Sequence, residues 1–236
     1  MTYRYVEHAG ARIAYRVSGS GPALVLLKNN RRPPDYPVSD FLAERFRVFQ
    51  LHPIGFGASD RPDVYDFGSI GEQVLAVLDH EGVDRLGVWG FSQTACMAAM
   101  VARSTDRAAA LAMGGVVPIG MPTDGEMRRM EREPRLPRPA LEFWRAYRAY
   151  DWHHELRCYP GRRVAYLGTA DPAIRRFRRL RPVLEGIGVA YLEFEGLNHS
   201  TCGLGDAAGD GRRPDSPCQA RVAQEVVVRI GGGAAA

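Results

Sequence analysis

Short apolar segments alternate with helical patterns along most of this chain, and that order constrains its fold more than any other feature. Three β-type segments come first, at residues 2–8, 11–17 and 23–27, and the third, ALVLL, is apolar throughout. Later segments of this type lie at 46–51, 85–90, 109–117, 163–168 and 190–194. Helical patterns lie at 70–78, 93–103, 172–185 and 219–230. This order predicts an α/β fold with a mostly parallel central sheet flanked by helices and antiparallel strands at its N-terminal side.

Residues 118–160 break this alternation. They are rich in charged residues, proline and aromatic side chains, and residues 138–157 carry a strong helical pattern. We expect residues 1–117 and 161–236 to form the core of the fold and residues 118–160 to form a small helical lid inserted in it. Since one face of a lid normally lines the pocket, Trp144 is a candidate substrate contact, and an apolar or aromatic substrate is expected.

The composition is that of a globular protein and argues against several classes. Hydrophobic residues make up 45% of the 236 residues, but no apolar run approaches the roughly 20 residues that span a bilayer. The N-terminal MTYRYVEHAG lacks the order of a signal peptide, so a cytoplasmic location without a membrane partner is expected. The cysteines lack metal-type spacing, which favours free thiols and no bound metal at Cys96, Cys158, Cys202 and Cys218.

Arginine dominates the basic residues. The net charge is +4, Lys28 is the only lysine, and fifteen arginines fall between Arg128 and Arg181. In AIRRFRRLRPVL the apolar residues recur every third position while arginines fill the others, which is typical of an amphipathic helix with a solvated basic face. The pattern lacks the interleaved aromatics of a nucleic-acid platform, so no nucleic-acid partner is expected. A basic surface also allows an acidic, carrier-linked substrate.

A serine stands at the bend between a predicted strand and a predicted helix, in VWGFSQTACMAAM. A tight turn there needs small neighbours, which Gly90 and Ala95 supply. It would raise the hydroxyl of Ser92 above the carboxyl ends of the strands, beside the free N–H groups of a helix N-terminus. The position suits a nucleophile, although a simple helix N-cap is the alternative reading.

A serine nucleophile needs a base and a group that orients the base. Of six histidines only His199, in EGLNHST, follows the last predicted strand. Asp171, in YLGTADP, follows the preceding strand, where it also suits the start of a helix. The chain order of Ser92, Asp171 and His199 is that of the nucleophile-elbow hydrolases. Asp124 is a minor alternative for the acid.

Five segments together resemble the α/β-hydrolase superfamily over nearly the whole chain. They are ALVLL with its following loop, HPIGFGASD, GFSQT, GTADP and GLNH. The resemblance implies Ser92 as nucleophile, His199 as general base and then acid, and Asp171 as its orienting group. It also implies an acyl-enzyme, an oxyanion hole from the backbone N–H groups of Gln93 and Asn30, and no metal or organic cofactor. Haloalkane dehalogenases and epoxide hydrolases share this fold but need a carboxylate where Ser92 stands.

The sequence departs from the family pattern at three places. Thr94 replaces the second glycine of the elbow, which is expected to crowd the helix against the strand. The loop after ALVLL has Lys28-Asn29-Asn30 where the family commonly has His-Gly, so Lys28 and Asn29 are candidate substrate contacts, and Lys28 or Asn30 could supply a side-chain oxyanion donor. His52 stands where the family usually has aspartate and is read as a turn residue bonded to Asp60 or nearby backbone.

These observations predict a serine hydrolase that acts on a small-molecule ester, thioester or lactone, as a monomer or homodimer. Two alternatives stay open. The altered loop allows a non-hydrolytic enzyme of secondary metabolism on the same scaffold, such as a lyase, acyltransferase or cyclase, because function does not follow from fold. A binding protein that keeps the scaffold without turnover is the other.

Overall fold

One eight-stranded sheet organises the chain in the computed structural model, which describes residues 2–29, 38–116, 118–203 and 217–231. The strands stand in the order β1-β2-β4-β3-β5-β6-β7-β8. The first two pair antiparallel, β2 pairs antiparallel with β4, and all later pairs are parallel. The strands are β1 (Arg4–His8), β2 (Ala11–Ser18), β3 (Ala23–Leu27), β4 (Arg47–His52), β5 (Leu86–Phe91), β6 (Ala108–Gly114), β7 (Arg162–Gly168) and β8 (Ala190–Phe194). The predicted α/β-hydrolase fold is confirmed.

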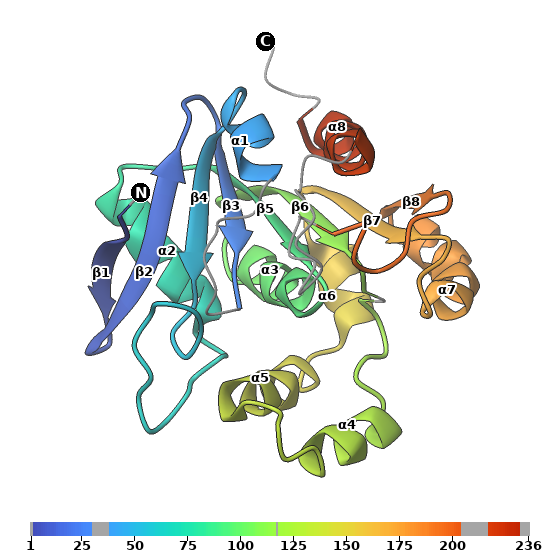
Figure 1. Ribbon diagram of the computed structural model, residues 1–236, viewed down its shortest axis with the longest axis horizontal. Coiled ribbons are helices and arrows are strands. Elements are labelled where there is room, and N and C mark those ends of the chain that lie inside the picture. The colour runs from blue at the N-terminus through green and yellow to red at the C-terminus, as the bar shows by residue number, and fades with distance from the viewer. Residues whose placement is uncertain (1, 30–37, 117, 204–216, 232–236) are drawn as a thin grey trace.

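Helices cover both faces of this sheet, as Figure 1 shows. One core contains Val25 and Val88 together with α2, α3 and α7, and the other contains Leu24 and Trp89 together with α1 and α8. Successive strand residues point to opposite faces, which explains why both faces of the central strands are apolar. These helices are α1 (Val38–Ala43), α2 (Ile70–His80), α3 (Gln93–Arg103), α7 (Ile174–Gly186) and α8 (Pro217–Gly231).

Three further helices lie between β6 and β7, and we call them the three-helix segment: α4 (Asp124–Glu131), α5 (Arg138–Tyr147) and α6 (Trp152–Cys158). The single helical pattern predicted for 138–157 is broken at residues 148–151. The Asp151 carboxylate accepts hydrogen bonds from the N–H groups of His153 and His154 and so starts a new helix. Helix α4 was not predicted from the sequence, although it begins with a capping box between Thr123 and Glu126.

The parallel strands point toward the three-helix segment. In Figure 1 the β3 arrow points to the bottom of the view, where α4 and α5 lie, while α8 lies at the top. The carboxyl ends of parallel strands therefore meet on the side of α5, where ligands bind in open α/β sheets. Among the residues that the structure describes, no helix is long and apolar enough to cross a membrane.

Candidate active site

Ser92 occupies the turn between β5 and α3 with a backbone conformation that non-glycine residues rarely adopt. Its φ is 57° and its ψ is −128°. The Ser92 N–H donates to the carbonyl of Gly114 in the neighbouring strand at 2.8 Å, which holds the strained residue in place. A Cβ atom at Gly90 would stand 2.0 Å from the carbonyl oxygen of Thr94, so glycine is required there. The predicted bend is present.

Thr94 takes part in the turn instead of merely filling the place of a glycine. Its side chain is buried, and its hydroxyl lies 2.9 Å from both the backbone nitrogen and the carbonyl oxygen of Phe91. The hydroxyl thereby accepts a hydrogen bond from the N–H of Phe91 and donates one to the carbonyl of the same residue, at the end of β5. The crowding expected from Thr94 is offset by a local hydrogen-bond pair that fastens the helix start to the end of the strand.

Asp171 and His199 form a hydrogen-bonded pair beside this turn. The Nδ1 atom of His199 lies 2.7 Å from Oδ2 of Asp171, whose side chain is only 3% exposed. The other carboxylate oxygen accepts from the N–H of Ala173 at 2.8 Å. Asp171 thereby orders the turn that leads into α7, but it does not cap this helix, because the N-cap residue is Ala173 and no side chain caps it. A carboxylate that is ionised only accepts hydrogen bonds, so this contact favours the tautomer with the proton on Nδ1, in which a neutral imidazole keeps the lone pair of Nε2 for a reacting group.

The imidazole of His199 lies against the elbow. Its ring centroid is 5.0 Å from that of Phe91, the residue before the serine. The Ser92 hydroxyl forms no hydrogen bond with any residue in the described part of the chain, so it is not hydrogen-bonded to His199 in this structure. Hydrogen bonds between a nucleophile and its base are often long without substrate and shorten in the reacting complex. No sequence pattern indicates the Phe91–His199 contact, because those residues are far apart in the chain.

The loop after β3 reaches the elbow through Asn29. Its side-chain amide donates to Oε1 of Gln93 at 2.9 Å. The neighbouring Lys28 side chain is only 1% exposed, which leaves almost no surface of it for the predicted substrate contact. Asn30, the predicted second oxyanion donor, lies outside the described residues.

Trp144, the predicted substrate contact in α5, is half-buried. Its ring packs 5.2 Å from that of Phe143 and 5.8 Å from that of Tyr147, measured between ring centroids. Part of the Trp144 side chain therefore packs against other residues of α5 within the three-helix segment.

His52 and Asp124, two other polar residues with predicted roles, have partners outside the pair of Asp171 and His199. His52 is buried, and its Nδ1 accepts the N–H of Ala58 at 2.7 Å, as expected for a turn residue bonded to nearby backbone. Asp60 instead forms an ion pair with Arg12. Asp124, the alternative acid, is exposed at the start of α4 and forms an ion pair with Arg148.

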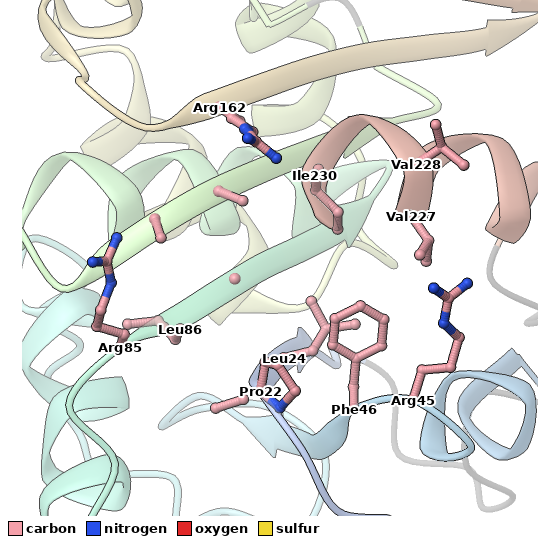
Figure 2. A pocket seen from close by; sticks show the side chains of 14 residues that line it. Pro22, Leu24, Arg45, Phe46, Arg85, Leu86, Arg162, Val227, Val228 and Ile230 are labelled. Atoms are coloured by element: carbon pink, nitrogen blue, oxygen red, sulfur yellow. The ribbon is translucent and has the colours of Figure 1, made fainter. Parts of the chain in front are cut away.

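A cavity of about 830 Å³ lies at the opposite ends of the strands. Figure 2 shows Arg45, Arg85 and Arg162 around apolar side chains that include Leu24 and Ile230. Its described lining residues lie at or just before the starts of the parallel strands or belong to α8, whereas Ser92 follows the end of a strand. They include neither a nucleophile nor a base, so this cavity is not the candidate active site. In the described part of the chain, no three His, Cys, Asp or Glu residues gather closely enough to hold a metal ion.

A comparison with protein families matches residues 30–173 to the alpha/beta hydrolase fold. The match covers more than half of the chain, including Ser92 and Asp171, and ends before His199. The chain belongs to the α/β-hydrolase family. A comparison with curated proteins finds no match.

Solved structures of other α/β hydrolases share the fold at low sequence identity. E-2-(acetamidomethylene)succinate hydrolase has a TM-score of 0.71 at 14% identity, over 98% of this chain and 99% of that one. An esterase from Rhodococcus has a TM-score of 0.64 at 21% identity, over 98% and 99%. The enol-lactonase from Burkholderia xenovorans has a TM-score of 0.65 at 19% identity, over 97% and 100%. These similarities show the common fold and assign no role to any residue of this chain.

Proposed function

We propose that this α/β hydrolase is a serine hydrolase that cleaves an ester, thioester or lactone through an acyl-enzyme on Ser92. The observation that carries the proposal is the 2.7 Å hydrogen bond between Asp171 and His199, beside a serine held in a strained turn. If Ser92 merely capped its helix, there would be no reason for the Asp171–His199 pair to form or for the ring of His199 to lie beside that of Phe91.

The proposed reaction begins with the hydroxyl of Ser92. Its oxygen forms a bond to the substrate carbonyl carbon while Nε2 of His199 takes its proton. The carbonyl oxygen becomes an oxyanion, which the N–H groups of Gln93 and Asn30 are proposed to stabilise. Asp171 keeps the imidazole in the correct tautomer and stabilises its charged form.

Collapse of the tetrahedral intermediate breaks the bond to the alcohol or thiol, which takes the proton back from His199. Water then attacks the acyl carbon in a second cycle of the same kind. His199 removes a proton from the water and returns one to the oxygen of Ser92, which releases a carboxylic acid. No further reactant is needed.

The ester and lactone substrate classes draw support from the relatives, which include proteins named as an esterase and an enol-lactonase. The thioester class, the lid role of the three-helix segment and an apolar or aromatic substrate are proposals from the sequence. A non-hydrolytic reaction on the same scaffold is the second candidate. The feature that favours it is the sequence Lys28-Asn29-Asn30 directly after β3, which we call the oxyanion loop.

The proposal is tested by intact-mass analysis after incubation with a fluorophosphonate. We expect one adduct on the wild type, formed as the oxygen of Ser92 bonds to phosphorus and fluoride leaves. The adduct should be absent in Ser92→Ala, strongly slowed in His199→Ala and retained in Ser69→Ala, a control serine at the start of α2. An adduct that persists in Ser92→Ala, or a folded wild type without one, would contradict the proposal and favour the non-hydrolytic or binding alternatives.

Asp171→Asn tests the orienting group separately. The amide keeps the size of the carboxylate but favours the wrong imidazole tautomer, so we expect kcat for p-nitrophenyl acetate to fall by about 10⁴-fold. Asp124→Asn, at the alternative acid, should leave kcat within about twofold of the wild type, since a surface ion pair contributes little. Equal effects of the two substitutions would remove Asp171 from the proposed triad.

A further inference from the structure

The side chain of Gln93 joins three parts of the molecule that are distant in sequence. Gln93 is the first residue of α3, directly after the proposed nucleophile. Its Oε1 accepts from the side-chain amide of Asn29 at 2.9 Å, and its Nε2 lies 3.4 Å from the carbonyl oxygen of Ala140. Asn29 follows β3, and Ala140 lies in the first turn of α5.

The backbone carbonyl of Ala140 fixes the orientation of both amides. A carbonyl oxygen only accepts, so Gln93 must turn Nε2 toward it and Oε1 toward Asn29. Asn29 must in turn present its NH₂ group to that oxygen. Ala140 is buried, whereas Asn29 and Gln93 are half-buried, so α5 provides the fixed end of this chain of contacts.

These contacts lie where oxyanion stabilisation is proposed. The N–H of Gln93 belongs to the first turn of α3, where N–H groups have no partner within the helix. Asn29 immediately precedes Asn30, the other proposed donor. A side chain that holds Asn29 relative to the N-terminus of α3 therefore constrains the described part of the loop that precedes the second proposed donor.

We propose that Gln93 is a positioning residue that couples α5 to the oxyanion loop through its side chain. When α5 is in place, Gln93 holds Asn29 and the site is assembled. Without the contact to Ala140, the Gln93 amide loses its fixed partner and Asn29 loses its constraint. The inference rests on the proposed function, because it assigns a role in the stabilisation of the oxyanion of that reaction.

Gln93→Met is the main test, because methionine has a similar length and helix propensity but no amide, and the backbone N–H remains. We expect kcat for p-nitrophenyl acetate to fall about tenfold while KM stays within about twofold, since positioning acts on the transition state. Asn29→Ala should lower kcat similarly, and the double variant should be no slower than Gln93→Met alone, because both remove one link. Glu142→Gln, elsewhere on α5, is the matched control and should leave kcat unchanged.

Hydrogen exchange tests the coupling without turnover, in proteins that also carry Ser92→Ala. Gln93→Met should raise exchange both in the peptide that contains residues 23–29 and in the one that contains 138–147. Asn29→Ala should raise it only in the first, because the bond to Ala140 remains. Glu142→Gln should raise it in neither the first peptide nor the first turn of α5.

The two measurements separate the outcomes. Unchanged exchange in both peptides of Gln93→Met would overturn the coupling. Raised exchange with an unchanged kcat, or kcat losses that add in the double variant, would overturn the positioning role. A folded wild type with neither turnover nor a fluorophosphonate adduct would overturn the proposed function and the catalytic role of Gln93, while the exchange experiment would still decide whether α5 and the loop are coupled.

Discussion

At the scale of single residues, the elbow shows how one substitution changes the way a turn is stabilised. A second glycine at position 94 would let the helix approach the strand without making any contact of its own. Thr94 instead places a hydroxyl between the N–H and the carbonyl of Phe91, both at 2.9 Å. The strained turn at Ser92, whose φ is 57°, is therefore held by the hydrogen bonds between Thr94 and Phe91 and by the bond that the Ser92 N–H donates to the carbonyl of Gly114.

Thr94→Val should lower the free energy of unfolding by about 2 kcal/mol, because valine keeps the shape of the side chain but leaves two partly buried backbone groups of Phe91 without this partner. For a chain of this length the melting temperature should fall by about 4–8 °C. Calorimetry of Thr94→Val beside Thr2→Val, an exposed threonine, checks the expectation. Equal melting temperatures for the two variants would show that the hydroxyl adds nothing to the turn.

At the scale of elements, Glu81 fastens the end of α2 to the antiparallel side of the sheet. Its carboxylate accepts from the hydroxyl of Tyr15 in β2 at 2.7 Å and from Arg4 in β1 at 2.9 Å, and it pairs with Arg47 in β4. Burial alone would raise the pKa of Glu81, but the hydrogen bonds from Tyr15 and Arg4 and the charges of Arg4 and Arg47 hold it below its usual 4.5. Burial and the bond to Glu81 raise the pKa of Tyr15 to about 12.

Glu81→Gln should lower the free energy of unfolding at pH 7 by about 2 kcal/mol, since it replaces a charged acceptor of several hydrogen bonds by a neutral amide. The lowered pKa means that the carboxylate stabilises the folded state fully above pH 4.5, and that this stabilisation is lost as the pH falls through the folded-state pKa. The difference between variant and wild type should therefore shrink below pH 4.5.

Urea unfolding at pH 7, 5 and 3.5 measures this difference. Glu185→Gln removes an exposed ion pair with Arg181 and should change the unfolding free energy by less than about 0.5 kcal/mol at each pH. A Glu81→Gln difference that stayed constant down to pH 3.5 would show that the charge of Glu81 is not what stabilises this corner.

At the scale of the whole molecule, two cores share one sheet. Leu24 belongs to the core under α8, and its neighbour Val25 belongs to the core under α2 and α3. On the α8 side, the indole N–H of Trp89 donates to the hydroxyl of Tyr166 at 2.9 Å, so these two buried side chains link β5 to β7. Because every central strand contributes to both cores, loss of one core removes support from the other.

Val226→Ala should therefore destabilise the whole fold. Val226 is fully buried in α8, and the loss of two methyl groups and the resulting cavity should lower the unfolding free energy by about 2–3 kcal/mol. Val228→Ala is the matched control on the same helix. Because Val228 is 68% exposed, this substitution should change the free energy of unfolding by less than about 0.5 kcal/mol. Far-UV and near-UV circular dichroism should report one common unfolding transition in each variant; separate midpoints would mean that the two cores unfold independently.

The sequence by itself determined the eight strands, the order of most helices and the elbow at Ser92. Apolar runs and helical periodicity are local properties of the chain, because the spacing of apolar side chains follows the backbone geometry of a single strand or helix. The carboxyl ends of parallel strands meet at one edge, so the positions of Asp171 and His199 after two strands were enough to predict that they lie near each other. The structure joins them at 2.7 Å.

Only the tertiary structure decided the contacts between distant segments. The break between α5 and α6 accompanies the stacking of Tyr147 on Trp152, with ring centroids 4.2 Å apart, which a continuous helical pattern does not reveal. The hydrogen bond between Asn29 and Gln93 joins residues that are 64 positions apart in the chain. Such contacts depend on which strands pair and how the helices pack across them, whereas a sequence pattern reports only the spacing within one element.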